Sequence, residues 1–206
     1  MSGTYPSSPI PISVVIRSVQ PSYVSVSHAL TVQRRTRNAQ RFAIELIYPP
    51  VASWDSFAPL WTFLLAQKGR AESFTYTLPV AIMPARGTWS GTPLVNGASQ
   101  TGESIDLDGF TPSDTGVAKA GDLIRFGSGK KVYTVTADAD ANISGEAAVS
   151  IQPALVVSPG DGDAVSVHKS TGGIDFTMSL SAEDLSLPLQ HCIRYGIQVE
   201  LAEVID

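Results

Sequence analysis

The sequence predicts a mainly β protein in which one α-helix packs on a β-sheet, with a β-sandwich or barrel-like core and an inserted small all-β module. Short stretches of alternating apolar and polar residues recur along most of the chain, which is the pattern of half-buried strands. Only residues 55–69 show the three- and four-residue spacing of an amphipathic helix. Glycine and proline become frequent between residues 79 and 109, which indicates a loop-rich exit from the first part of the chain.

The composition indicates a folded protein and excludes several classes. A chain of 206 residues with 43% hydrophobic and 16% charged residues can bury a real core and is not disordered. A net charge of −5 gives no general basic footprint for nucleic acid. The single cysteine, Cys192, can form no internal disulfide, and we expect it to be a small core residue. No secretory signal or membrane-spanning run is found, so we expect a protein made in the cytoplasm without membrane insertion.

The first part of the chain reads as three or four strands between residues 11 and 48. Between them lies a basic run with four arginines, Arg34, Arg35, Arg37 and Arg41. The first interpretation is the solvated end of a hairpin. The second is an interface with an acidic partner, because basic runs are commonly contact surfaces. Nucleic acid is a minor possibility.

The helix is expected over about residues 56–68. Pro59 has no N–H group and belongs in a first turn, which places the N-cap at Asp55 or Ser56 and not as early as Ser53. Gly69 supplies the left-handed stop. The spacing puts Phe57, Leu60, Trp61, Leu64 and Leu65 on one face. The predicted structural core consists of Phe57, Leu60, Trp61, Leu64, Phe74 and Tyr76, the last two from a strand that follows the helix.

The domain organisation follows from the order of the strands. A hairpin over residues 122–136 and a strand at residues 147–151 form a second, all-β unit. Strands near residues 174–180 and 193–201 match the character of the first sheet. We therefore predict a discontinuous domain, residues 1–80 with 170–206, interrupted by a module at residues 81–169.

Each candidate motif for catalysis or for a cofactor lacks residues that the motif requires. The segment Gly127–Lys131 lacks the flanking residues of a phosphate-binding loop. The segment Asp138–Glu146 resembles a calcium loop but has Ile143 where a glycine is required and Val149 where a bidentate glutamate is required. No Gly-x-Ser-x-Gly elbow or paired histidine motif occurs. The sequence therefore predicts no enzyme, no cofactor and no metal site.

Several fragments, taken in order, match a known family over nearly the whole chain. They include Ala39–Phe42, Phe63–Gly69, Ala85–Thr88, Gly91–Gly97, Ala120–Ile124, Val132–Val135 and Gly145–Val149. In their order and spacing they resemble the distal tail proteins of long-tailed bacteriophages.

The resemblance implies a structural protein of the virion. Such proteins form a ring, usually a hexamer, at the distal end of the tail tube, where they join the tube to the hub and the receptor-binding components. The tape measure and the DNA pass through the ring without sequence-specific binding. In that role Arg34, Arg35, Arg37 and Arg41 become candidates for the subunit interface. The chain lacks the long carbohydrate-binding insertion of some relatives, so the resemblance does not imply direct binding to the host.

Three other functions remain open at this stage. The first is an isolated carbohydrate-binding β-sandwich module, which would present exposed aromatic side chains. The second is another tail component, a tube or a hub protein. The third is a cell-wall hydrolase, which would need a carboxylate pair or a zinc site that the sequence does not supply.

Overall fold

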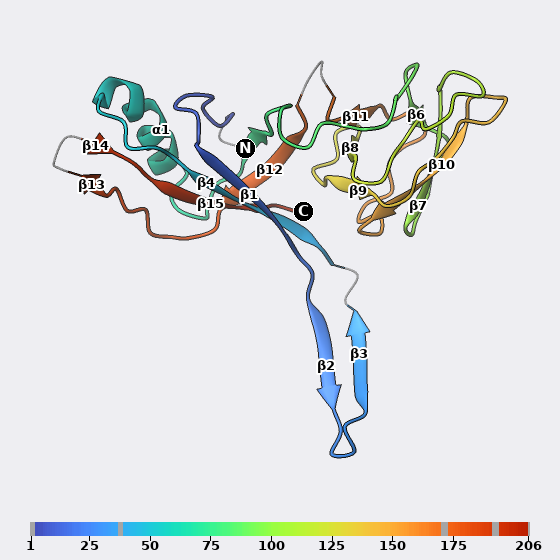
Figure 1. Cartoon of the computed structure of the whole chain (residues 1–206), viewed down its shortest axis with the longest axis horizontal. Helices are drawn as coiled ribbons and strands as arrows, with labels where there is room; N and C mark the ends of the chain where they lie inside the picture. Colours follow the sequence, from blue (N-terminus) through green and yellow to red (C-terminus); the bar gives the residue numbers. More distant parts are fainter. Residues whose placement is uncertain (1–2, 37–38, 170–172, 191–193, 206) are drawn as a thin grey trace. The chain divides into compact units, whose positions relative to one another are not determined.

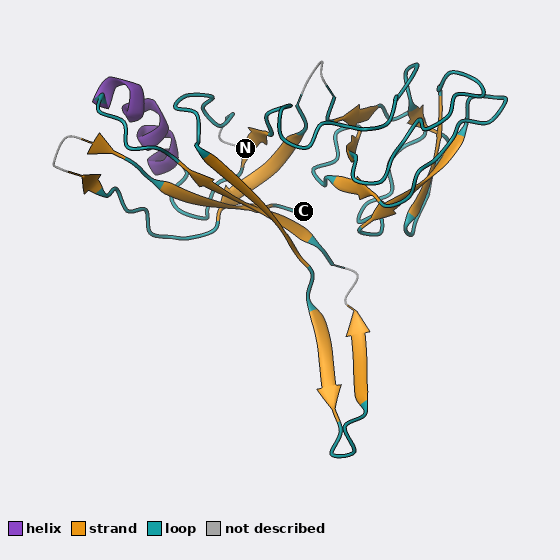
Figure 2. Ribbon diagram, viewed as in Figure 1, coloured by secondary structure: helices purple, strands orange, loops and turns teal. Residues whose placement is uncertain are grey.

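A computed structural model describes residues 3–36, 39–169, 173–190 and 194–205 of the chain. The chain divides into two compact units, Met1–Tyr76 with Thr177–Asp206, and Thr77–Phe176. The sequence places the two boundaries near residues 80 and 170. The predicted fold class is confirmed, because the described residues are mainly strands and loops with α1 (Trp54–Ala66) as their only helix (Figure 2).

The first unit is built on a five-stranded sheet with the order β1-β4-β15-β12-β5. Its strands are β1 (Ser13–Val19), β4 (Arg41–Ile47), β5 (Phe74–Thr77), β12 (Asp175–Leu180) and β15 (Gln198–Glu203). Alternate residues of β4 point to opposite faces of the sheet, and Phe42, Ile44 and Leu46 are all buried on one of these faces. β1 and β15 flank β4 in antiparallel register, with Ile16 and Leu201 both opposite Ile44. This places Ile16, Ile44 and Leu201 on the same face of the sheet.

Two further strand pairs belong to the first unit. The strands β2 (Ser22–Val26) and β3 (Val32–Thr36) form a hairpin inserted between β1 and β4. The strands β13 (Leu189–Gln190) and β14 (Arg194–Tyr195) form a short second pair. In Figure 1 the β2–β3 hairpin lies outside the five-stranded sheet, beyond the ends of β1 and β4.

The helix begins two residues earlier than predicted. Its N-cap is Ser53, so the prediction of an N-cap at Asp55 or Ser56 was wrong, and Pro59 lies in the second turn. Pro59 removes one main-chain hydrogen bond. The two added residues include Trp54, whose ring centroid lies 5.0 Å from that of Tyr195, and this aromatic packing favours the earlier start. The helix ends at Ala66 with Gln67 as its C-cap, so the predicted end at residue 68 was two residues late. The left-handed conformation begins at Lys68, with a φ of 53°, and continues at Gly69, with a φ of 66°.

The buried stripe of α1 is narrower than the spacing predicts. Phe57, Leu60 and Leu64 are buried, and Phe74 and Tyr76 of β5 are buried as well. Trp61 is only partly buried, and Leu65 is exposed, so its predicted place on the apolar face was wrong. Each residue turns about 100° around the helix axis, and Leu65 therefore lies at the edge of a stripe centred on Leu64.

This difference gives a matched pair of variants. Leu64 is 1% exposed and its neighbour Leu65 is 53% exposed. We expect Leu64→Ala to lower the free energy of unfolding by about 3 kcal/mol, because it leaves a cavity in the core, and Leu65→Ala to change it by less than about 1 kcal/mol. Urea denaturation followed by circular dichroism measures both, and equal losses would show that the stripe is misplaced.

An N-terminal segment and a cluster of tyrosines complete the core of the first unit. Tyr5 pairs with β5, its N–H donating to the Thr75 carbonyl at 2.8 Å, and its ring lies edge-on to Tyr76. The Tyr48 hydroxyl donates to the Tyr5 hydroxyl at 3.0 Å. Burial is the main cause that raises the pKa of all three phenols, and it raises the pKa of Tyr48 to about 12.

Alkaline pH should therefore unfold this unit. The folded state keeps these phenols neutral while the unfolded chain ionises near pH 10, so the stability they contribute is complete below about pH 10 and falls as the pH rises toward the pKa of about 12 of Tyr48. Each such phenol contributes a loss of about 1.4 kcal/mol per pH unit in that window. Urea denaturation at several pH values measures the slope. The Tyr48→Phe variant should have a shallower slope, and an unchanged slope would contradict this explanation.

The second unit is a six-stranded sheet with the order β11-β8-β9-β10-β7-β6. Its strands are β6 (Leu94–Val95), β7 (Ser104–Asp108), β8 (Leu123–Phe126), β9 (Tyr133–Val135), β10 (Ala147–Gln152) and β11 (Val165–Val167). The two edge strands approach each other, because Leu94 forms an antiparallel bridge with Ala164 and the Val95 N–H donates to the Asp163 carbonyl at 2.9 Å. The sheet therefore nearly closes into a barrel around its own apolar core.

A buried carboxylate ties together the loops at one end of this barrel. Asp122 is 1% exposed and precedes β8. One of its oxygens accepts the Arg86 N–H at 2.6 Å. The other accepts the Gly87 N–H, the Lys119 N–H and the indole N–H of Trp89, at 3.0, 3.0 and 2.7 Å. The segment 86–89 is thus held as an ordered loop although it has no regular secondary structure.

Candidate functional site

The β2–β3 hairpin is the most exposed regular structure in the described chain, and we call residues 22–36 the arm. Its strands pair from Ser22 opposite Thr36 to Val26 opposite Val32. The turn is closed by the Ser27 N–H to the Thr31 carbonyl at 3.0 Å and by the Leu30 N–H to the Ser27 carbonyl at 2.9 Å. Leu30 at this turn is 81% exposed. The arm is therefore a preformed β-ribbon whose apolar side chains are not buried within its own unit.

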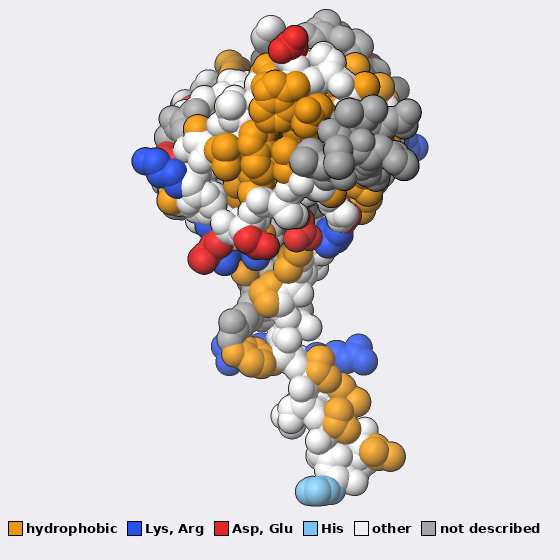
Figure 3. All heavy atoms as spheres, turned by 90° about the vertical axis from the view of Figure 1, so that its left-hand side faces the viewer, with side chains coloured by type: hydrophobic (Ala, Val, Ile, Leu, Met, Phe, Trp, Pro, Cys, Tyr) orange, Lys and Arg blue, Asp and Glu red, His pale blue; other side chains and the backbone are white. Residues whose placement is uncertain are grey.

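The register sorts the arm into two unlike faces. Residues directly opposite each other in an antiparallel pair point to the same side. One face carries Val24, Val26 and Val32 together with Arg34, and we call it the apolar face of the arm. The other carries Tyr23 opposite Arg35 and Ser25 opposite Gln33. Figure 3 shows hydrophobic side chains gathered along the arm, where the three valines are between 45% and 58% exposed.

The predicted arginines do not form one cluster. Arg34 and Arg35 lie in β3, where they point to opposite faces of the arm, and Arg41 begins β4 opposite Val19. All three are exposed, and Arg37 lies outside the described residues. The interpretation of this run as a hairpin end was wrong, because the turn falls at residues 27–31 and the arginines follow it.

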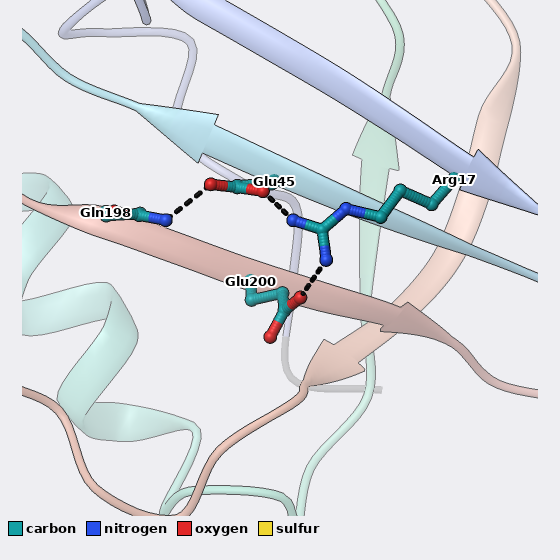
Figure 4. Close-up of polar contacts among 4 residues, drawn as sticks. All are labelled: Arg17, Glu45, Gln198 and Glu200. Atoms are coloured by element: carbon teal, nitrogen blue, oxygen red, sulfur yellow. Dashed lines mark hydrogen bonds and ion pairs between the residues drawn. The ribbon is translucent and has the colours of Figure 1, made fainter.

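A charged network crosses three strands of the first sheet, on the face opposite to the buried residues of β4. The guanidinium of Arg17 on β1 forms ion pairs with Glu45 on β4 and, at 2.8 Å, with Glu200 on β15. The side-chain amide of Gln198 donates to the other oxygen of Glu45 (Figure 4). Sequence reasoning missed these four residues. A charged Arg17 within a strand that contains Val14 and Ile16 could have indicated an ion pair on the opposite face of the sheet. Its partners could not be named, because they depend on which strands lie beside β1.

The second unit has a shallow polar groove. It is lined by Asn96, Asp106, Leu107, Asn142, Glu146, Ala147 and Ala148. Two of its polar groups bond each other, the Asn142 amide donating to Glu146 at 2.8 Å. None of these lining residues is aromatic, and Trp89 of this unit is buried. The groove therefore lacks the flat aromatic platform that the carbohydrate-binding alternative expects.

Metal-binding groups and membrane-spanning helices were sought among the described residues. Among them, no group of three or more His, Cys, Asp or Glu side chains is arranged to hold a metal ion. Cys192 and His191 lie outside this part of the chain. Within the described residues, no helix has the length and apolar character to cross a bilayer.

Comparison with known proteins finds a family that part of the chain resembles. The chain is similar to a bacteriophage distal tail protein, which is a component of the virion. The family model that matches is the B domain of distal tail protein pb9, and it covers residues 82–169. The matched residues lie within the second unit, and over these residues the match confirms the resemblance to a distal tail protein that the sequence predicts. No curated protein sequence matches the chain.

Proposed function

We propose that this protein forms a ring at the distal end of a phage tail, where it joins the tail tube to the hub and the receptor-binding components. The ring is a homohexamer with an open centre, through which the tape measure and the DNA pass. The role is structural and requires no catalytic residue, cofactor or metal ion. The observation that carries the proposal is the match of residues 82–169 to a distal tail protein domain.

The arm supports the assembly part of the proposal. A β-ribbon with exposed valines on one face is a surface that monomeric proteins rarely keep in contact with water. A contact between the arm of one copy and a different surface of the next is heterologous, and heterologous contacts close into rings when the rotation between copies is a simple fraction of a turn. The exposed Arg34, Arg35 and Arg41 are then available for the contact between subunits.

The match favours this proposal over the alternatives. The family model that matches residues 82–169 describes a distal tail protein, which supports this role over that of a tube or a hub protein. The carbohydrate-binding alternative expects exposed aromatics on the binding module, whereas Trp89, Phe110, Phe126 and Tyr133 of the second unit are buried, and the exposed Tyr23 and Trp54 belong to the first unit.

Negative-stain electron microscopy of the purified protein tests the proposal. We expect closed rings of about six subunits with an open centre. A second sample, mixed with tail tubes assembled from purified tube protein, should show the rings at one end of each tube. Compact single particles in the first sample and bare tube ends in the second would overturn the proposal.

A further inference from the structure

The solvent side of the first sheet offers a surface for the arm, and we call it the outer face. It is formed by alternate residues of β1, β4 and β15, which lie side by side in the register Val15, Glu45, Glu200. The opposite side of the same strands is the core, where Ile44 and Leu201 are fully buried. On the outer face Val15 is 39% and Val19 is 42% exposed. The outer face therefore combines exposed apolar side chains with the charged network of Figure 4.

The charges on the outer face are not balanced at its centre. Two carboxylates, Glu45 and Glu200, share the single guanidinium of Arg17. The Glu200 side chain is 44% exposed and uses one oxygen in this pair, whereas only 13% of the Glu45 side chain is exposed. Arg41 also lies on this face, but four residues along β4 from Glu45, or about 14 Å, which exceeds the screening distance at physiological salt. An unbalanced negative charge therefore remains at Glu200.

The apolar face of the arm has the complementary composition. It presents three valines and one cation, Arg34, whose directly opposite neighbour is Val24. We propose that the apolar face of the arm of one copy packs on the outer face of the neighbouring copy, with Arg34 against Glu200. The valines would meet Val15 and Val19, and Arg34 would supply the positive charge that the two carboxylates lack. This inference rests on the proposed ring, because it names the surface by which one subunit holds the next.

The arm contains its own control. Arg34 and Arg35 have the same charge, are adjacent in the chain and are both exposed, but they point to opposite faces of the arm. A contact through the apolar face requires Arg34 and not Arg35. General attraction between a basic arm and an acidic surface would depend on both equally.

A charge-exchange experiment tests the inference. We compare the wild type, Arg34→Glu, Arg35→Glu, Glu200→Lys and the double variant Arg34→Glu/Glu200→Lys, measuring the protein concentration at half assembly by light scattering. We expect Arg34→Glu and Glu200→Lys each to raise it by at least about tenfold, Arg35→Glu to raise it by less than about threefold, and the double variant to return near the wild type. Circular dichroism at each concentration confirms that every variant is folded.

The outcomes separate this inference from the proposed function. A wild type that forms no ring under any condition, with or without tail tubes, overturns the proposed function. A wild-type ring with equal effects of Arg34→Glu and Arg35→Glu, or a double variant no better than the single ones, overturns only the placement of the arm.

Discussion

The Asp122→Ala variant should lower the free energy of unfolding of the second unit by about 3–5 kcal/mol, which is the largest loss of stability that we expect from a single substitution in this chain. The carboxylate accepts four N–H groups, from Arg86, Gly87, Trp89 and Lys119, and is 1% exposed. Alanine leaves these donors without an acceptor and opens a cavity beside Trp89. Urea denaturation followed by tryptophan fluorescence measures the loss.

The Asp138→Ala variant is the matched control, because it removes an aspartate that is exposed. Asp138 is exposed and accepts one main-chain N–H, that of Ala120, at 2.9 Å. Asp138→Ala should cost about 1 kcal/mol or less. If both variants unfold at the same urea concentration as the wild type, Asp122 does not hold the loop 86–89 and our explanation of this end of the barrel is wrong.

Removing the arm should abolish the ring without unfolding the subunit. Val19 and Arg41 are directly paired at the ends of β1 and β4. A two-residue Asn-Gly turn can therefore replace residues 20–40 and join the two strands as a tight hairpin. We expect this variant to be monomeric at every concentration at which the wild type is assembled, because the exposed valines and arginines of the arm are gone.

The fold of the shortened chain is controlled separately. The deletion removes Gln40, whose side-chain amide donates to the Ser18 hydroxyl at 3.0 Å, so a loss of about 1 kcal/mol is expected. Circular dichroism and urea denaturation should otherwise match the wild type. Rings that persist in the folded, armless protein would show that the arm is not needed for assembly.

The sequence predicts the strands whose alternation is regular. In β4 the buried Phe42, Ile44 and Leu46 alternate with half-buried residues, and the prediction of a strand there is confirmed. β7 was missed although Ile105 and Leu107 are buried on one side, because glycines at 102 and 109 and aspartates at 106 and 108 gave the segment the composition of a loop. The tertiary packing of two apolar residues was enough to override that composition.

The arm shows that alternating apolar residues can predict a strand correctly although the same chain does not bury its apolar face. Val24 and Val26 predict a strand with one buried face, and the strand exists, but the valines are exposed. The pattern is accounted for if the face is buried in an assembly. The ion pairs of Arg17 could not be predicted, because Glu200 is 183 residues away in the chain and becomes a neighbour only through the order β1-β4-β15.

The start of the helix shows the limit of a single strong rule. Pro59 argues for a first turn, and that rule placed the start of the helix after Trp54. The contact between Trp54 and Tyr195 that extends the helix joins residues from the two chain segments that make up the first unit. No local pattern contains that contact.

The native mass of the purified wild type by light scattering tests the central claim most directly. A single chain has a mass of 21.8 kDa. The account predicts a main species of about six times this mass, which decreases toward one chain on dilution and in the armless variant. A wild type that keeps the mass of one chain at all concentrations would contradict the claim that the protein assembles itself into a ring.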